Sequence, residues 1–267
     1  GSFTNADLTI ENGTLSAVAT TNSGASTDDK VFTATFTPTA NLEDLSNVIT
    51  LANTGVTDVA TNEGVGTTSS AEYEIDTVRP DATITIADTA LKAGETTTVT
   101  ISFTEVVSGF ANADLTVANG TLSAVATADG GRTYTATLTP STSTDDNSNV
   151  ITLANTGFTD PAGNAGTGTT TSANYAVGTV VPTVASKISM DDTALKVGDT
   201  ATVTVVFSEA VTGLTVGDFD VANGSLSGLT TSNNITWTAT YTPTANITET
   251  SNVVSLPAGT VIDSDGN

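Results

Sequence analysis

The stretch DATITIADTALKAGETTTVTISFTEVV at residues 81–107 places apolar residues at every second position and decides the fold. Val99, Ile101 and Phe103 alternate with threonine and serine, a period of two that is typical of an antiparallel strand with one face in water. Threonine is both β-branched and polar, so it favours strands and tolerates solvent. No segment has the spacing of an amphipathic helix. The sequence therefore predicts an all-β protein.

The same phrases recur along the chain. Asn-Gly-Thr/Ser-Leu-Ser occurs at 12–16, 119–123 and 223–227, and Ser-Asn-Val-Ile-Thr-Leu at 46–51 and 148–153, with a looser copy at 251–256. The copies lie 102 to 107 residues apart, which is too long for a solenoid turn and suits a tandem array of small domains. We place the domains at 1–79, 80–181 and 182–267.

The middle copy is the complete one. The first copy lacks the counterpart of 81–108 and the third lacks the last strand, so we expect the sequence to be part of a longer chain. In the middle copy, alternation predicts strands near 82–87, 96–104, 113–118, 121–127, 132–139, 148–156 and 170–177.

About seven short antiparallel strands in each domain predict a two-sheet, Ig-like β-sandwich. The antibody pattern Cys…Trp…Cys is absent, so we expect an Ig-like domain rather than an Ig domain proper. Asn-Gly between short alternating segments indicates a hairpin, which should join the third and fourth strands. A short insertion in the first copy, around 21–29, is expected to form a surface loop.

Composition excludes several classes of function. The chain has 29 acidic and six basic residues, a net charge of −23, and neither cysteine nor histidine. So acidic a surface repels nucleic acid and anionic lipid, and no apolar run is long enough to cross a membrane. Disulfides, Ser–His chemistry and ordinary zinc sites are also excluded. We expect no direct membrane insertion and place any export signal or anchor outside this sequence.

Several phrases resemble a known family. Asp88–Glu95 (DTALKAGE), Phe103–Val107 (FTEVV) and Asp160–Asn164 (DPAGN), with counterparts at 192–199, 207–211 and 263–267, are similar to the bacterial Ig-like repeats of very large surface adhesins. The resemblance covers essentially the whole chain. It implies the extender region of calcium-dependent, type I-secreted (RTX-type) biofilm adhesins. It further implies an extracellular location on the bacterial cell surface, with neighbouring repeats of the same chain as partners.

An Ig-like sandwich also fixes which loops meet at the domain junctions. Glu105 and the 160–164 loop should return to the linker at 74–81, where Arg79 is the nearby cation. The preceding domain should present Glu43 and Asp44 there, in the loop between its fifth and sixth strands. Converging carboxylates repel one another unless a hard cation lies among them, and calcium accepts six to eight oxygen ligands. We therefore predict a Ca²⁺ site between the first and second domains, with the candidate ligands Asp76, Asp81, Glu105, Asp160 and Asn164.

The second junction repeats this pattern with a difference. Its candidate ligands are Glu209, Asp263, Asp265 and Asn267, but Gly178 stands where Asp76 stood and the linker 178–182 has no acid. We expect that site to be weaker, differently coordinated or empty. For both junctions the alternative is a set of solvated loop acids that make only turn hydrogen bonds. For the Asp88 and Asp191–Asp192 turns we favour such Asx-type turns over a cation.

The leading function is a structural extender (spacer) that projects an adhesive tip from a cell surface. Two other classes remain open. One is a module that binds a glycan or a protein, and the other is a self-assembling filament or surface layer in which copies of the chain exchange strands. Glu105 and Asp160 could act as a carboxylate pair, as in a glycosidase. However, the acidic residues at each domain junction, here called the seam, recur from domain to domain, which is unusual for an active site. We therefore predict that the protein is not an enzyme.

Overall fold

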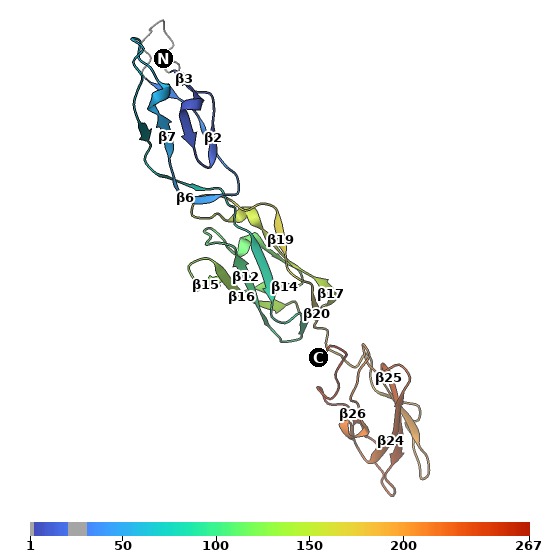
Figure 1. Ribbon diagram of the computed structural model, residues 1–267. Helices are drawn as coiled ribbons and strands as arrows, with labels where there is room; N and C mark the ends of the chain where they lie inside the picture. Colours follow the sequence, from blue (N-terminus) through green and yellow to red (C-terminus); the bar gives the residue numbers. More distant parts are fainter. Residues whose placement is uncertain (1–2, 21–30) are drawn as a thin grey trace.

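The computed structural model describes residues 3–20 and 31–267 and arranges them as three all-β domains in a row (Figure 1). The expected loop at 21–29 lies outside the described residues. Five three-residue 3₁₀ turns are the helical elements of the described chain, and none has the length and apolarity needed to cross a bilayer. They are η1 (Asn5–Asp7), η2 (Asn53–Gly55), η3 (Asn112–Asp114), η4 (Asn155–Gly157) and η5 (Val216–Asp218).

The middle domain is a sandwich of two β layers, as the alternation predicts. One layer has the order β10-β12-β16-β14, with β15 also paired to β16. The other layer consists of two short sheets, β11-β20-β17 and β13-β18-β19. The first layer comprises β10 (Ala82–Ile86), β12 (Thr97–Phe103), β14 (Gly120–Leu122), β15 (Ala126–Thr127) and β16 (Thr133–Pro140). The second comprises β11 (Ala90–Lys92), β13 (Leu115–Val117), β17 (Asp145–Asn149), β18 (Ile151–Ala154), β19 (Thr169–Thr171) and β20 (Tyr175–Gly178).

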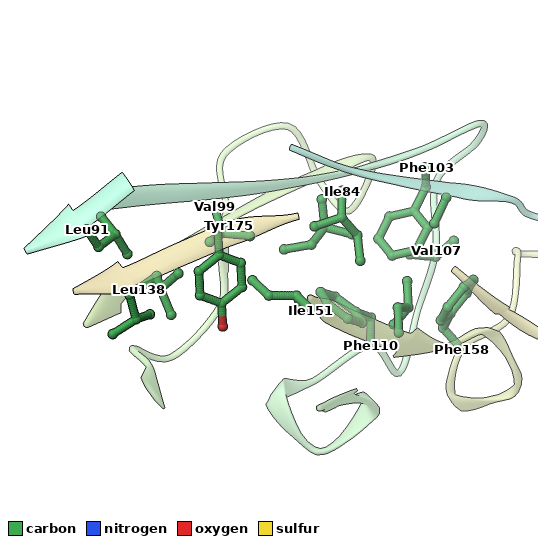
Figure 2. Close-up of a cluster of buried hydrophobic side chains, with 14 residues drawn as sticks. Ile84, Leu91, Val99, Phe103, Val107, Phe110, Leu138, Ile151, Phe158 and Tyr175 are labelled. Atoms are coloured by element: carbon green, nitrogen blue, oxygen red, sulfur yellow. The ribbon is translucent and has the colours of Figure 1, made fainter. Parts of the chain in front are cut away.

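The core of this domain lies between the two layers (Figure 2). Val99 and Ile101 of β12 are fully buried and face Tyr175 and Val177 of β20, while the intervening threonines are more exposed. At the end nearer the first domain, Phe103 packs edge-to-face on Phe158, with ring centroids 4.7 Å apart. Each such side chain contributes about 1.5–3 kcal/mol by leaving water. The prediction of an Ig-like β-sandwich is confirmed.

The predicted Asn-Gly hairpin is wrong. The segment does join β13 to β14, but β13 pairs with β18 in one layer and β14 pairs with β16 in the other. Asn119 takes a left-handed conformation (φ 46°), and its amide donates to Asp146 and Asn149 at 2.9 and 2.7 Å. These bonds anchor the turn to β17, so it carries the chain across the sandwich.

The first domain has the same order of elements as the middle domain has from η3 onward. Its sheets pair β7 with both β1 and β8, β2 with β5, β3 with β4, and β6 with β9. The strands are β1 (Leu8–Ile10), β2 (Gly13–Leu15), β3 (Ala19–Thr20), β4 (Phe32–Thr33), β5 (Phe36–Pro38), β6 (Glu43–Asn47), β7 (Ile49–Ala52), β8 (Thr67–Ser69) and β9 (Tyr73–Asp76).

The third domain keeps the four-stranded layer, in the order β21-β22-β25-β24, and pairs β23 with β26 opposite it. Its last residue, Asn267, lies back at the junction with the middle domain (Figure 1). The strands are β21 (Ser189–Met190), β22 (Ala201–Val206), β23 (Asp220–Val221), β24 (Gly224–Thr231), β25 (Thr236–Pro243) and β26 (Val254–Ser255).

Candidate metal centre at the domain junctions

Three segments bring carboxylates to the first junction. β9 of the first domain ends at Asp76, and the linker then leads into β10. β12 runs antiparallel to β10 with Phe103 opposite Ala82, so Glu105, two residues further on, returns to the linker. Asp160 begins the loop that follows η4. The predicted convergence of Asp76, Glu105 and Asp160 is therefore what the sandwich produces.

One carboxylate oxygen from each of Asp76, Glu105 and Asp160 lies within 4.8 Å of the other two. Asp160 is buried, and the other two are partly buried. Glu43, which pairs with Asp76 across β6 and β9, adds its negative charge to the field at Glu105. The expectation that Glu43 lies in a loop is wrong, because β6 begins at this residue.

The aspartates of this cluster have hydrogen-bond donors of their own. The two oxygens of Asp160 accept from the backbone N–H and the side-chain amide of Asn164, at 2.8 and 2.7 Å. The Asn164 amide also donates to the backbone carbonyl of Asp76 at 3.0 Å, and Asp76 accepts from the Val78 N–H at 3.1 Å. Asn164 thus fastens the loop of the second domain to the last strand of the first.

Glu105 is different, because its Oε1 atom is fully buried and has no hydrogen-bond partner. Burial raises the pKa of Glu105, and the charges of Asp160, Asp76 and Glu43 raise it further, while Arg132 lowers it. The Arg132 guanidinium donates to the Thr104 carbonyl at 2.7 Å. The seam therefore combines clustered negative charge with an oxygen that lacks a donor.

Two further residues near the seam take other partners. Arg79, the cation predicted there, donates to the Ala165 carbonyl at 2.6 Å. Asp81 is exposed at the start of β10, where its carboxylate accepts from the Ala82 N–H at 2.8 Å. Asp81 is outside the group that gathers within 4.8 Å, so the structure does not bring this predicted ligand to the other three.

The second junction has the same construction around Glu209, whose Oε1 atom is likewise buried without a partner. Burial raises the pKa of Glu209, as do the charges of Asp263, Asp145 and Asp265. Burial also acts to raise the pKa of Asp263, but hydrogen bonds from Asn267, Asp265 and Gly266 outweigh it and the pKa is lowered. Asp145 of β17 is the counterpart of Glu43, so the preceding domain again adds its charge.

Asn267 fastens the second junction as Asn164 fastens the first. Its amide donates to the carbonyls of Gly178 and Val180 at 3.0 and 3.1 Å, and to Asp263 at 2.9 Å. Its side-chain oxygen accepts from the Ala93 N–H of the middle domain at 2.6 Å. Both of these predicted ligands, Asn164 and Asn267, therefore serve as clamps between domains in this structure.

The two junctions differ in the origin of one carboxylate. A Cβ atom placed on Gly178 would lie 2.5 Å from an oxygen of Asp265, so the Asp265 carboxylate fills the space where the Asp76 side chain would begin. The counterpart of Asp265 in the middle domain is Ala162. One junction thus has Asp76 with Ala162, and the other has Gly178 with Asp265. Among the described residues, the first junction is the one that gathers three acidic oxygens within 4.8 Å.

The remaining acidic turns have simpler explanations. Asp58 holds Asn62 in the loop geometry of Asp160 and Asn164, with its carboxylate accepting from the Asn62 N–H and amide at 2.9 Å each. Asp88 and Asp192 accept from the N–H two residues on, at 3.0 and 2.9 Å, which defines Asx turns. Asp191 instead accepts from the Thr202 N–H at 2.6 Å. The Asx turns at Asp88 and Asp192 are therefore present, and the preference for them over a cation stays a prediction.

The sandwiches and their repeated seams define this chain as a tandem array of Ig-like domains. The bacterial Ig-like domain family matches residues 1–75, 76–177 and 178–267, and the chain belongs to this family. Among solved structures, it is similar to FdeC, described as a broadly conserved Escherichia coli adhesin that elicits protection against urinary tract infections. That likeness has 14% identity and a TM-score of 0.36, over 97% of this chain and 84% of the other. No curated protein matches the chain.

Proposed function

We propose that the chain is a set of structural extender repeats from a large bacterial surface adhesin, stiffened by Ca²⁺ at its domain junctions. The observation that supports calcium most directly is the buried, unpartnered Oε1 of Glu105 beside two more carboxylates. A buried charged oxygen without a donor is costly, and a hard cation is the partner that removes the cost. Glu209 repeats the buried, unpartnered oxygen at the second junction, which suits a structural element that recurs along the chain.

The residues present fit a hard cation such as calcium better than zinc or copper. They supply carboxylate oxygens alone, with no histidine or cysteine in the whole chain. Asp76, Glu105 and Asp160 would hold the ion at the first junction, and Glu209, Asp263 and Asp265 at the second. Bound calcium would supply positive charge and oxygen coordination. Asn164 and Asn267 would keep the loops in place beside it.

The origin of the ligands explains why binding would stiffen the chain. Asp76 belongs to the last strand of the first domain, whereas Glu105 and Asp160 belong to the second. One ion would therefore tie the first and second domains together, and a bent junction would separate its ligands. At the second junction the three carboxylates all belong to the third domain, so an ion there would support the loop that Asn267 attaches to the middle domain. A ligand present at 100 times its dissociation constant stabilises the bound state by about 2.7 kcal/mol.

Calcium affinity would also match the proposed location. Extracellular modules bind calcium with constants of about 10⁻⁴ to 10⁻³ M. At such values the rod is stiff outside the cell and slack in the low-calcium cytoplasm. This difference suits export by a type I (RTX-type) route and display in a biofilm at the bacterial cell surface.

Small-angle scattering of the chain at pH 7 tests the proposal, first with calcium and then with chelator. The expected result is a maximum dimension that shortens or spreads on chelation and recovers with calcium but not with magnesium. Glu105→Gln together with Glu209→Gln should make the profile insensitive to calcium. An unchanged profile for the wild-type chain would contradict calcium stiffening, and the acidic clusters would then be ordinary surface.

A further inference from the structure

The two junctions differ in how their carboxylates are divided between neighbouring domains. At the first junction Asp76 ends β9 of the first domain and faces Glu105 and Asp160 of the second. At the second junction the equivalent position is Gly178, and the Asp265 carboxylate of the third domain lies against it. The first junction therefore draws its three acids from two domains, whereas the second draws Glu209, Asp263 and Asp265 from one.

This division determines whether an ion can act on the docking of the domains. An ion shifts the equilibrium between docked and separated domains only if it binds the two states with different affinity. At the first junction, separation removes Asp76 from the site, so the docked state binds the ion more tightly. At the second junction, the three acids stay together in the third domain when the domains separate, so the affinity changes little.

Electrostatic repulsion distinguishes the junctions in the same way. Without an ion, Asp76 repels Glu105 and Asp160 across the boundary, and this repulsion pushes the first and second domains apart. The corresponding repulsion at the second junction acts within the third domain, so it does not separate that domain from the middle one. Glu43 and Asp145 add negative charge from the preceding domain at both junctions, so they do not distinguish them.

The second junction also has hydrogen bonds that do not require an ion. The Asn267 amide donates to the carbonyls of Gly178 and Val180, on the strand and linker that precede the third domain. The loop that carries Asn267 is closed by its own bonds, since Asp263 accepts from the N–H groups of Asp265 and Asn267 at 2.9 Å each. Hydrogen bonds alone therefore hold both the loop and the clamp.

We propose that the first junction is a calcium-gated joint, which docks with calcium and loosens without it, and that docking at the second junction does not depend on calcium. The deciding pair is the residue that ends the preceding strand and its neighbour in the following loop, namely Asp76 with Ala162 or Gly178 with Asp265. This assignment rests on the proposed calcium function and specifies how it is regulated. A chain that contains both kinds of joint bends at defined places when calcium is removed.

Distances across each joint test the proposal, because the chain has no cysteine and can be labelled at chosen pairs of positions. Thr37, Thr139 and Thr242 are exposed and occupy equivalent positions in the three domains, each beside the proline that pairs with the glycine of the Asn-Gly turn. Labels at Thr37→Cys and Thr139→Cys span the first joint. Labels at Thr139→Cys and Thr242→Cys span the second.

Spin-label distance distributions at pH 7, in calcium and in chelator, are the measurement. The distribution across the first joint should become at least twofold broader in chelator and should narrow again when calcium is restored. The distribution across the second joint should be the same in both conditions. Neither comparison requires a substitution in the seams, so neither depends on a seam variant being folded.

Exchanging the deciding pair tests its role directly. Asp76→Gly with Ala162→Asp should abolish the response of the first joint, and Gly178→Asp with Asp265→Ala should confer a response on the second. Equal responses of the two wild-type joints, or exchanges that leave the response where it was, would overturn the assignment but not calcium stiffening itself. If neither wild-type joint responds, calcium stiffening and the assignment are both wrong.

Discussion

Glu105 and Glu209 each hold a carboxylate oxygen that is buried and that no donor reaches. Other acids of the two seams are better satisfied, since Asp160 and Asp263 accept several hydrogen bonds from their own loops. An unpaired buried polar atom costs about 1–3 kcal/mol because it has lost its water without gaining a partner. In the metal-free chain these two glutamates should therefore destabilise the junctions that they occupy.

The first prediction follows from this cost. Without calcium at pH 7, Glu105→Gln should raise the free energy of unfolding of the middle domain by about 1 kcal/mol, because it removes a charge that faces Asp76 and Asp160. With calcium the same variant should be less stable than the wild type, because it has lost a ligand. Thermal unfolding in chelator and in calcium measures both effects.

Glu72→Gln is the matched control for this variant, since Glu72 is exposed in the first domain. It should change stability little under either condition. If Glu105→Gln is destabilising without calcium as well, the carboxylate has a favourable partner in the folded chain and the account of the seam is wrong.

The second prediction concerns the carboxylate that comes from Asp76 at the first junction and from Asp265 at the second. Gly178→Asp should destabilise the second junction by about 1–3 kcal/mol, because its Cβ would crowd the Asp265 carboxylate. Gly178→Asp with Asp265→Ala should recover most of that loss, because it reproduces the pair Asp76 and Ala162. Unfolding of the two single variants and the double variant forms a double-mutant cycle. Additive effects would show that the two positions do not share one space.

The sequence was sufficient to predict the convergence of Asp76, Glu105 and Asp160, because sandwich topology determines which loops meet. It did not determine which side chains reach the seam. Asp81 belongs to the same linker as Asp76, but its side chain is exposed. Asn164 reaches the junction through its amide, which donates a hydrogen bond to the Asp76 carbonyl. The role of Asp265 had a signal in the sequence, since Gly178 and Asp265 both differ from the first junction, but only the structure shows that they share a space.

At the scale of elements, alternation located the long strands of the middle domain well. β10, β12 and β16 match the predicted segments closely, since each has buried residues at every second position. It missed β11, because three residues are too few to show a period and the strand depends on β20 beside it. The sequence also did not show that the Asn-Gly turn crosses from one layer to the other, because this depends on side-chain hydrogen bonds from Asn119 to β17.

The third prediction tests that anchoring. Asn149 joins three elements through bonds with Asn119, Asp146 and Tyr175, and it is 1% exposed. Asn149→Ala should lower the stability of the middle domain by about 2–3 kcal/mol, because it leaves buried backbone carbonyls without donors. Calorimetric unfolding measures the loss.

The control is Asn252→Ala, the same change at the equivalent exposed position of the third domain. Its bonds to Glu249 and Asn223 compete with water, so the expected loss is below about 1 kcal/mol. Equal losses for the two variants would show that burial of the asparagine is not what makes the anchor strong.

At the scale of the whole molecule, three domains in a row bring the acidic residues of successive domains together at each seam. The net charge of −23 opposes close approach of the domains, and the amide clamps of Asn164 and Asn267 hold them against it. The seams are thus where solution conditions should act most strongly, whereas the core of the middle domain should be insensitive to them.

The last prediction is the pH dependence of the metal-free chain. The pKa of Glu105 and Glu209 is raised above the ordinary value of 4.5 by burial and by neighbouring acids, which for Glu105 are Asp160, Asp76 and Glu43, opposed by Arg132. The folded state therefore binds more protons than the unfolded state above about pH 4.5, and stability should rise as pH falls from 7 to 5.

At lower pH, stability should instead fall as pH falls. The reason is that hydrogen bonds lower the pKa of four aspartates below the ordinary value of 3.8, namely Asp58, Asp129, Asp191 and Asp263. Their contribution is present above pH 3.8 and is lost as pH falls through the lowered values, so the metal-free melting temperature should peak between about pH 4 and 5. Calcium must shift this peak toward neutral pH, because its carboxylate ligands have to be deprotonated. Melting curves of dialysed chain from pH 3 to 8, with and without calcium, measure both profiles. Coincident profiles would mean that the seam acids do not bind the ion. A metal-free melting temperature that does not rise from pH 7 to 5 would mean that burial and mutual repulsion do not raise the pKa of the two glutamates.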